Sequence, residues 1–354
     1  MAVYDFSADN STHWGEELMA ITLGLEKGWN WASHNLDSKV HTSRFTGYAQ
    51  YIVGQYDSYV KDDANKWSGN LEMVNSAAGY KIKMSEAADI TLRGNLFDVN
   101  TSVTVKKGWN WLGCPLYNTT TIEAALKNYV PTEGDAIVGI NAFATYENGH
   151  WVGTLTSLSP GQAYLFKCSV EQTFCWNSLS TSVVRRAKRY NAPKRDAEAS
   201  APWQVDMHAY PNVISVIAAL DMGTEATDNY IVAAFSNEEC RGIAQDVDGL
   251  LYMNIHGEGG EALNFKIMDA EGVVYNAEQT LSLTPEKVVG SRKSPYRITL
   301  KGSDVQTPSL SAMRVVSTTY YTLSGVQITQ PLSGVFVEKT VYENGNTIIR
   351  KVVR

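Results

Sequence analysis

Apolar and polar residues alternate along most of the chain, in short runs that are separated by turn-forming residues. The runs Ile21-Thr22-Leu23-Gly24-Leu25 and Val103-Thr104-Val105 place their apolar side chains on one face of an extended strand. Residues 120–129 differ, because hydroxyl residues precede a short run with helical apolar spacing that ends at Val130-Pro131. The pattern therefore predicts a mainly β protein with minor helix.

The strands of the first half recur with a period near 80 residues. The segment Lys27-Gly28-Trp29-Asn30-Trp31 returns as Lys107-Gly108-Trp109-Asn110-Trp111. Three later segments follow in the same order: Ile52-Val53-Gly54 returns as Ile137-Val138-Gly139, Trp67-Ser68-Gly69-Asn70-Leu71 as Trp151-Val152-Gly153-Thr154-Leu155, and Gly79-Tyr80-Lys81-Ile82-Lys83 as Ala163-Tyr164-Leu165-Phe166-Lys167. This order predicts two homologous β-rich repeats, residues 15–97 and 98–180.

In each copy a Lys-Gly turn leads into the Trp-Asn-Trp strand. Period-two geometry places both tryptophans on one face and the asparagine on the other. Because the ring pair recurs, we interpret these residues as the core of the repeats. They are Trp29, Trp31, Trp109 and Trp111. A sugar-stacking surface is the alternative, since exposed aromatic faces offer sugars the same apolar area that builds a core.

A second aromatic pair is the better candidate for ligand contact. Trp67 and Trp151 each precede a small residue and a glycine in turn-rich sequence, so we expect them to be at least partly exposed. Tyr80 and Tyr164 complete this candidate set in the two copies. The predicted ligand is a glycan or a protein.

The second half is expected to contain a linker and two further β modules. Residues 181–202 lack periodicity, hold two prolines and are rich in Lys and Arg, which predicts an exposed basic linker that proteases can reach at Arg185-Arg186. Residues 203–302 contain alternating runs at the spacing of a β-sandwich. Residues 312–354 predict a small β-domain, with a hairpin turn at Glu343-Asn344-Gly345-Asn346.

Length and charge limit the possible partners. The chain has 354 residues, more than the roughly 250–300 that one hydrophobic core supports, so several modules are expected. Its net charge is −7, and no nucleic-acid recognition motif is present, so we expect no nucleic-acid partner. It has no run of 18 apolar residues, which predicts no membrane span. Residues 1–20 lack the apolar segment of a signal peptide, so an exported protein would carry its signal upstream or have lost it.

The sequence offers no catalytic signature. It contains no H-E-x-x-H, G-x-S-x-G or Walker A motif. Its histidines and cysteines have no metal-ligand spacing, so we predict no metal and no cofactor. Cys168 and Cys175 could form a disulfide across a hairpin, although free thiols are the preferred interpretation. The glycines of residues 257–262 and the acidic residues of 246–249 are both expected to form turns between strands.

The C-terminal segment contains three motifs in a fixed order: Tyr321-Thr322-Leu323-Ser324-Gly325, Gly334-Val335-Phe336-Val337 and Arg350-Lys351-Val352-Val353-Arg354. In this order they match a known consensus, and the segment resembles the sorting domain of type IX secretion cargo in Bacteroidetes. Thr322 departs from the usual aspartate, and the common basic residue near Val326 is missing. The resemblance implies recognition by an export machinery and an extracellular or outer-membrane surface location. The motif residues that it assigns are Leu323, Gly325, Gly334 and Lys351.

The Gly-Trp-Asn-Trp copies resemble repeats of large surface proteins of the same phylum. The third module is similar to a β-sandwich that often follows such repeats, through Val232-Ala233-Ala234-Phe235 and Glu239-Cys240-Arg241-Gly242. These resemblances imply a non-catalytic scaffold for adhesion or display, with a glycan or a host or bacterial surface protein as partner. A glycan-binding accessory region of a larger secreted hydrolase or peptidase is the alternative. An enzyme would require a convergent acid/base pair in a deep pocket.

Overall fold

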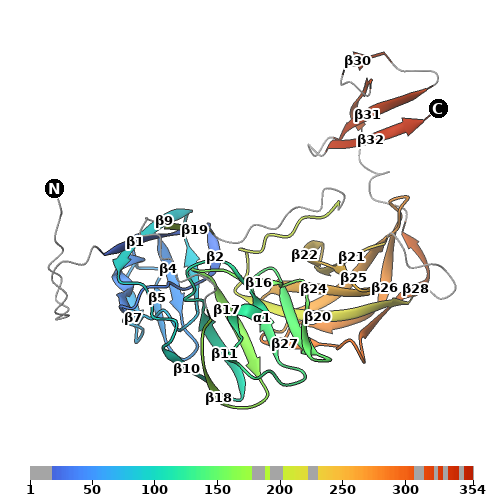
Figure 1. The fold of residues 1–354 in the computed structure, drawn as a ribbon. Coiled ribbons are helices and arrows are strands. Elements are labelled where there is room, and N and C mark those ends of the chain that lie inside the picture. The colour runs from blue at the N-terminus through green and yellow to red at the C-terminus, as the bar shows by residue number, and fades with distance from the viewer. Residues whose placement is uncertain are drawn as a thin grey trace.

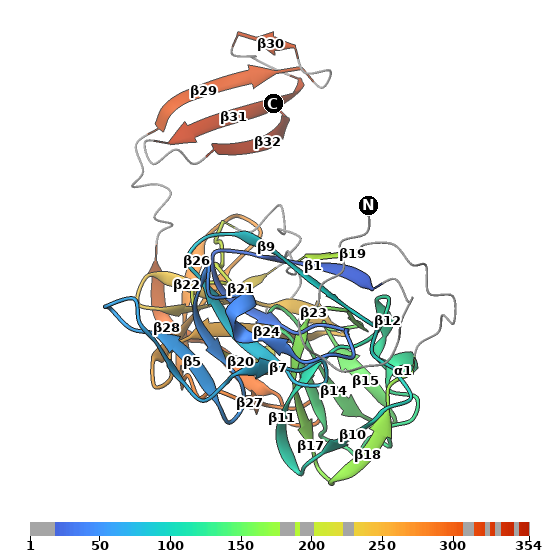
Figure 2. The same ribbon diagram turned by 90° about the vertical axis from the view of Figure 1, so that its left-hand side faces the viewer.

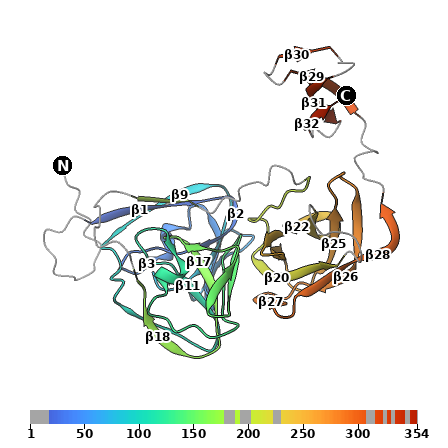
Figure 3. The same cartoon turned by 45° about the vertical axis from the view of Figure 1, so that its right-hand side comes forward.

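The computed structural model describes residues 18–177, 188–191, 202–221, 230–306, 315–322, 326–329, 334–342 and 347–353. The protein is mainly β with minor helix, as the alternating pattern predicted. The two repeats lie side by side and the third module adjoins them, while the C-terminal sheet stands apart in each view (Figures 1, 2 and 3). No helix in the described part of the chain has the length and apolar character that a membrane crossing needs.

Repeat 1 is built around a five-stranded sheet of order β2-β8-β4-β5-β6, with the pairs β1–β9 and β3–β7 beside it. Its elements are β1 (Met19–Leu25), β2 (Gly28–Ala32), β3 (Val40–His41), the 3-10 helix η1 (Thr42–Arg44), β4 (Ala49–Val53), β5 (Ser58–Lys61), β6 (Trp67–Gly69), β7 (Met73–Val74), β8 (Tyr80–Met84) and β9 (Ala88–Gly94).

Repeat 2 has the same strand order. Its five-stranded sheet runs β11-β17-β13-β14-β15, with the pairs β10–β18 and β12–β16. Its elements are β10 (Ser102–Val105), β11 (Gly108–Gly113), β12 (Thr120–Thr121), α1 (Ile122–Ala125), β13 (Ala136–Val138), β14 (Phe143–Glu147), β15 (His150–Gly153), β16 (Ser157–Leu158), β17 (Ala163–Cys168) and β18 (Gln172–Cys175). Thr121 caps the short helix α1 by accepting from Ala124 N. The repeated sequence segments thus fall on equivalent strands.

The two repeats meet through two equivalent backbone bridges, Ala32 to Gln162 and Ala78 to Leu112. Ala32 is the counterpart of Leu112, and Ala78 is the counterpart of Gln162, so exchanging the repeats exchanges the bridges. The backbones approach closely at this point, because a methyl group on Gly113 would overlap Ser33 Oγ and the Ser76 carbonyl oxygen. The repeats are therefore related by a local pseudo-twofold axis.

The basic segment predicted as an exposed linker contributes a strand to repeat 1. β19 (Lys188–Asn191) pairs in parallel with β1, on the edge that β9 leaves open. Tyr190 packs against the repeat 1 core, and its hydroxyl accepts a hydrogen bond from Asn35 Nδ2 at 2.8 Å. Arg189 forms an ion pair with Asp89. Four residues are too few to show a period, so the strand was invisible in the sequence; Arg185-Arg186 lies outside the described residues.

The third module is one nine-stranded sheet that curls toward a barrel, where the sequence predicted two packed sheets. Its strands are β20 (Asn212–Asp221), β21 (Ile231–Ser236), β22 (Glu239–Ile243), β23 (Gln245–Val247), β24 (Leu250–Gly257), β25 (Ala262–Met268), β26 (Val274–Ser282), β27 (Lys287–Val289) and β28 (Tyr296–Gln306). The long strand β28 joins the arm β22-β21-β25-β26 to the arm β20-β24-β23. Both arms contribute side chains to one core, such as Phe265 and Val216.

The C-terminal sheet has the order β30-β29-β31-β32. Its strands are β29 (Val315–Tyr321), β30 (Gln327–Ile328), β31 (Val335–Tyr342) and β32 (Thr347–Val353). Phe336 is buried against Tyr320, with 5.6 Å between ring centroids, and Arg350 pairs with the buried Glu338 at 2.6 Å. The hairpin turn predicted at residues 343–346 lies outside the described residues, and the strands on either side are antiparallel.

Candidate functional site

The asparagine of each Gly-Trp-Asn-Trp strand closes the turn before it. Asn30 Oδ1 accepts from Glu26 N at 3.0 Å, and its Nδ2 donates to Glu26 O at 2.8 Å. Asn110 makes the same two bonds with Lys106, both at 2.8 Å. Both side chains are buried toward their own repeat. The repeated Gly-x-Asn pattern is therefore turn chemistry.

The tryptophans lie on the opposite face, and this corrects their interpretation as the core of each repeat. Trp31 is buried, whereas Trp29, Trp109 and Trp111 are half-buried. Trp31, Trp109 and Trp111 belong to an apolar cluster that includes Met207 of the third module, so these three lie between modules. The Trp29 ring lies outside this cluster, beside Tyr51. Each sheet has two faces, and the face opposite the tryptophans covers the core of the repeat.

Polar groups of these strands bond to the third module. Trp31 Nε1 donates to Pro211 O at 3.3 Å, and Trp111 Nε1 donates to Glu286 Oε1 at 2.7 Å. The backbone N–H of Trp29 donates to His208 O at 2.7 Å, and His208 Nδ1 donates to Trp29 O at 2.6 Å. The indole N–H groups of the buried Trp31 and the half-buried Trp111 thus find their partners across the interface.

Lys81 lies at the centre of this contact. Its Nζ is 5.1 Å from the centroid of the Trp31 ring and 4.5 Å from that of Trp111, which are cation–π distances. The ammonium also donates to Asn212 Oδ1 at 3.2 Å. Burial lowers the pKa of Lys81 to about 8, and the nearby charge of Glu286 opposes that shift. We call Trp31, Lys81, Trp111, Asn212 and Glu286 the Trp–Lys junction, since all three modules meet there.

Sequence reasoning did not find the three junction residues that lie outside the Gly-Trp-Asn-Trp motif, namely Lys81, Asn212 and Glu286. Lys81 faces Trp31 across the β2–β8 pair, as Leu165 faces Trp111 in repeat 2. The sequence did contain an indication of the unusual role of Lys81, because alignment of the two repeats places it opposite Leu165. Nothing in the sequence indicated Asn212 or Glu286, which reach the site only through the docking of the third module.

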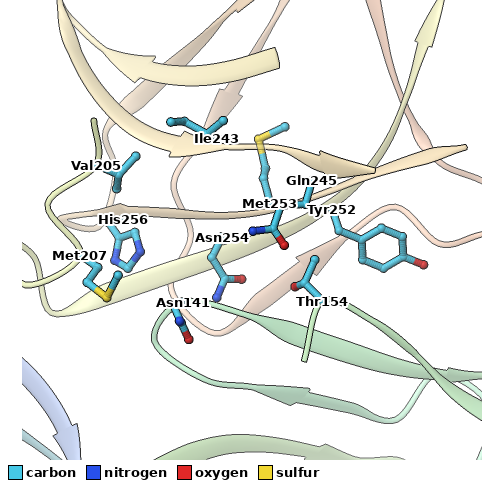
Figure 4. A pocket seen from close by; sticks show the side chains of 10 residues that line it. All are labelled: Asn141, Thr154, Val205, Met207, Ile243, Gln245, Tyr252, Met253, Asn254 and His256. Atoms are coloured by element: carbon cyan, nitrogen blue, oxygen red, sulfur yellow. The ribbon is translucent and has the colours of Figure 1, made fainter. Parts of the chain in front are cut away.

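A second contact area joins repeat 2 to the third module. Phe143 lies against Tyr252, with ring centroids 5.3 Å apart. Asn254 donates from Nδ2 to Gly139 O at 2.9 Å and accepts from Ser215 Oγ at 2.8 Å. Figure 4 shows Asn254 projecting toward the repeat 2 loop that carries Asn141. The space beside Asn141, Tyr252 and Asn254 has a volume of about 10 Å³, which is about one water molecule.

Charged groups surround this apolar contact. Glu147 is buried and accepts from Arg292 N at 3.1 Å. Lys293 pairs with Glu133 at 2.7 Å, and this ion pair lies at the surface. The docking surface therefore has an apolar centre and a polar rim, as stable interfaces between proteins do.

Trp67 and Trp151 lie on the core-facing side of their sheets, at the edge. Trp67 stacks on Tyr59, with ring centroids 4.8 Å apart and 16° between planes. Trp151 packs beside Tyr146 and Phe166, at 5.4 Å and 6.2 Å. Both tryptophans are half-buried. Their role in ligand contact stays a prediction.

Tyr80 and Tyr164 do not fit the predicted binding role. They are 3% and 6% exposed, which leaves no ring face for a ligand. Tyr80 OH accepts from Asn75 N and Tyr164 OH accepts from Ser159 N, both at 2.9 Å. Burial raises the pKa of both phenols. The two tyrosines are core residues that close equivalent turns.

The residues of the sorting-like motif are only partly covered by the structure. Gly334 is exposed and has φ of 106°, a conformation that favours glycine, immediately before β31. Lys351 is exposed on β32, opposite Val337. Leu323 and Gly325 lie outside the described residues. Their assignment therefore rests on the sequence resemblance.

Cysteines and possible metal ligands give no further site. In the part of the chain that the structure describes, no disulfide involves Cys114, Cys168, Cys175 or Cys240. Burial raises the pKa of the Cys168 thiol to about 11, which makes it unreactive. Within the described ranges, no group of three His, Cys, Asp or Glu side chains could hold a metal ion.

Comparison with known proteins adds no family. No family model matches the sequence, and no curated protein matches it. Among solved structures, the Bacillus anthracis TIE protein is similar at 8% identity with a TM-score of 0.17, over 86% of this chain and 53% of that one. The present chain spans about half of that protein, and the likeness is too weak to indicate a fold or a function.

Proposed function

We propose that this chain is a non-catalytic extracellular scaffold for adhesion or display, exported to the cell surface through its C-terminal sheet. The observation that best supports a scaffold is the Trp–Lys junction. Three of the repeated tryptophans, Trp31, Trp109 and Trp111, lie between modules, where they help to join the repeats to the third module. A scaffold depends on such contacts, because they fix the position of one module relative to the next.

The two small internal spaces favour a function in which the protein binds its partner on its outer surface. A second space, at the contact of repeats 1 and 2 with His208, has a volume of about 10 Å³, like the space beside Asn254. Cavities for small molecules are usually hundreds of Å³ in volume. Neither of these two spaces could hold a small-molecule ligand, which favours a partner that binds to an outer surface.

The export part of the proposal rests on the C-terminal sheet. The sequence resemblance to type IX sorting domains covers this sheet, and the sheet is separate from the other modules in Figure 3. Lys351 is exposed there and available to an export machinery.

A glycan-binding accessory region of a larger secreted hydrolase is the second candidate. The stacked pair of Trp67 and Tyr59 favours it, since half-buried aromatic rings can hold a sugar. This candidate predicts a catalytic domain elsewhere in the same polypeptide. It also predicts that soluble glycans quench tryptophan fluorescence in the wild type and not in Trp67→Ala.

Surface location is tested in the organism that encodes the chain. An antibody against residues 203–302 should label intact cells, and external protease should remove the label. Deletion of residues 312–354 should retain the protein inside the cell, with the undeleted protein as control. Detection of the undeleted protein in the cytoplasmic fraction alone would contradict the proposal.

A further inference from the structure

The tryptophan-bearing faces of the two repeats are equivalent, but they are covered differently. In repeat 2 this face includes Val138, Phe143 and Leu165, which are buried against the third module. In repeat 1 the third module covers the end at Trp31, and its His208 bonds to the backbone of Trp29 without covering the Trp29 ring. The remaining positions, which we call the open face, are half-buried or exposed; they are Trp29, Tyr51, Val53, Ser58, Val60, Ser68 and Lys83.

The strand registers show which residue of the open face corresponds to which residue of repeat 2. Ser58 is opposite Val53 as Phe143 is opposite Val138, so serine replaces phenylalanine. By the same registers, Lys81 replaces Leu165 and Ser68 replaces Val152. Two changes are in the other direction, because Tyr51 replaces Ala136 and Val60 replaces Thr145. The open face has lost the side chains that bury a protein module and has gained an aromatic ring.

Three side chains form a row across the open face. Trp29 on β2, Lys83 on β8 and Tyr51 on β4 are direct neighbours in register. The rings of Trp29 and Tyr51 are 5.7 Å apart between centroids, at 39° to each other. Lys83 Nζ lies 5.8 Å from the Trp29 centroid and 5.5 Å from the Tyr51 centroid. The row thus combines two ring faces with one positive charge.

The charge of Lys83 is available to a ligand. Lys81, two residues earlier, is enclosed by the junction and bonded to Asn212. Lys83 is half-buried and forms no ion pair with any residue that the structure describes. The open face contains no Asp or Glu, so an incoming anion meets no repulsion from it.

We propose that Trp29, Tyr51 and Lys83 form a binding site for an acidic carbohydrate. The two rings contact the apolar C–H faces of a sugar, and the Lys83 ammonium pairs with its carboxylate. The ring centroids of Trp29 and Tyr51 are 5.7 Å apart, so the row spans one sugar residue, and the hydroxyl of Ser58 offers a hydrogen bond beside it.

This site is separate from the scaffold role, because it uses no residue of the Trp–Lys junction, and Trp29 contacts His208 of the third module through its backbone while its ring belongs to the site. Failure of the carbohydrate experiment would leave the localisation experiment unaffected, and the reverse also holds. The site differs from the predicted Trp67 contact, which lies on the opposite side of the same sheet.

The test is titration calorimetry on the purified chain with acidic sugars and their neutral counterparts. The probes are oligogalacturonate against its carboxyl-reduced form, and 3′-sialyllactose against lactose, so that the source of the acidic sugar is also resolved. We expect binding of at least one acidic probe, at least tenfold tighter than its neutral counterpart and weaker at high salt.

Variants identify the site. Lys83→Gln should lose at least tenfold in affinity for the acidic probe, and Tyr51→Ala should weaken both members of the pair. Alanine is tolerated at the matching position of repeat 2, so Tyr51→Ala should fold, and a circular dichroism melt verifies this. Lys167→Gln, at the counterpart of Lys83, is the matched control and should bind as the wild type does.

Three results would overturn the proposal. They are no binding of any acidic probe at millimolar concentration, unchanged affinity in Lys83→Gln, and an equal loss in Lys167→Gln.

Discussion

At the scale of the residue, Lys81 is the least expected feature of the molecule. Its counterpart Leu165 shows that the site accepts an apolar side chain, yet repeat 1 places an ammonium between two indoles. Burying a charge costs free energy unless partners compensate for the lost water. The rings, Asn212 and Glu286 supply that compensation here, and burial still lowers the pKa to about 8.

This lowered pKa makes stability depend on pH. Between pH 8 and 10.5 the unfolded chain keeps a proton on Lys81 that the folded chain has lost, so the free energy of unfolding rises with pH across this window. The slope due to Lys81 should reach up to about 1.4 kcal/mol per pH unit. Lys81→Leu should remove this slope and stabilise the protein at pH 7 by about 1–3 kcal/mol.

Urea unfolding of the wild type and Lys81→Leu at several pH values between 7 and 10.5 measures the effect. The difference between the two curves should shrink as the pH rises, because Lys81 then becomes neutral in both states. Lys167→Met is the control and should follow the wild type. A difference that stays constant with pH would show that Lys81 is protonated normally in the folded protein.

Asn30 supports a second prediction. Its side chain is buried and bonds to both backbone groups of Glu26, so Asn30→Ala leaves buried polar groups without partners. We expect a loss of about 1–3 kcal/mol in the free energy of unfolding. Chemical denaturation checks this value. Asn70→Ala removes an exposed side chain that accepts from Ser58 N at 3.2 Å, and should cost less than about 0.5 kcal/mol.

At the scale of the element, the sequence predicted which side chains share one face of a strand. It did not predict what packs against that face. The alternation placed Trp29 and Trp31 on one face and Asn30 on the other, and the strand β2 has this arrangement. A period of two does not say which face covers the core, so the tryptophans were assigned to the wrong side. The helix α1 and its Thr121 cap followed from local residues alone.

Elements held by distant contacts could not be predicted. Strand β19 has four residues, and two distant contacts stabilise it. It pairs with the open edge of β1, and Tyr190 OH accepts a hydrogen bond from Asn35 Nδ2. The single curled sheet of the third module likewise depends on β28 joining two arms that are far apart in sequence. The partner of β19 lies more than a hundred residues away in the sequence, and β28 lies several tens of residues after its partner β20. Local sequence patterns do not extend over such separations.

Strand β19 supports a third prediction. Tyr190→Ala removes the aromatic ring that holds this strand on repeat 1, and should cost about 2–4 kcal/mol. Hydrogen exchange should become faster in β1, which pairs with β19, and stay unchanged in β10, its counterpart in repeat 2. Equal protection of β1 in the variant and the wild type would mean that the strand adds nothing to repeat 1.

At the scale of the whole molecule, the junction determines how the modules unfold. In the wild type, the repeats and the third module share the buried contacts of Trp31 and Trp111, so we expect them to unfold together. Trp111→Ala removes the ring beside Lys81 and the donor to Glu286. The variant should show two separate calorimetric transitions, one for the repeats and one for the third module.

Two variants refine this measurement. Trp67→Ala removes a ring on the other side of the repeat 1 sheet, and should lower the melting temperature without splitting the transition. Trp111→Phe keeps a ring but loses the bond to Glu286, and should give an intermediate result. A single transition in Trp111→Ala would show that the contact around Phe143 and Tyr252 suffices to couple the modules.

The paired bridges between the repeats have a consequence for how such a molecule can arise. Ala32 with Gln162 and Ala78 with Leu112 form a self-complementary contact, which is the symmetry of a homodimer whose subunits have been fused into one polypeptide. In a symmetric ancestor both tryptophan faces would be identical. Attaching a single domain at one end of the fused chain makes the two tryptophan faces unequal, because that domain can cover only one of them. The uncovered copy is then released from packing constraints and free to acquire a new specificity.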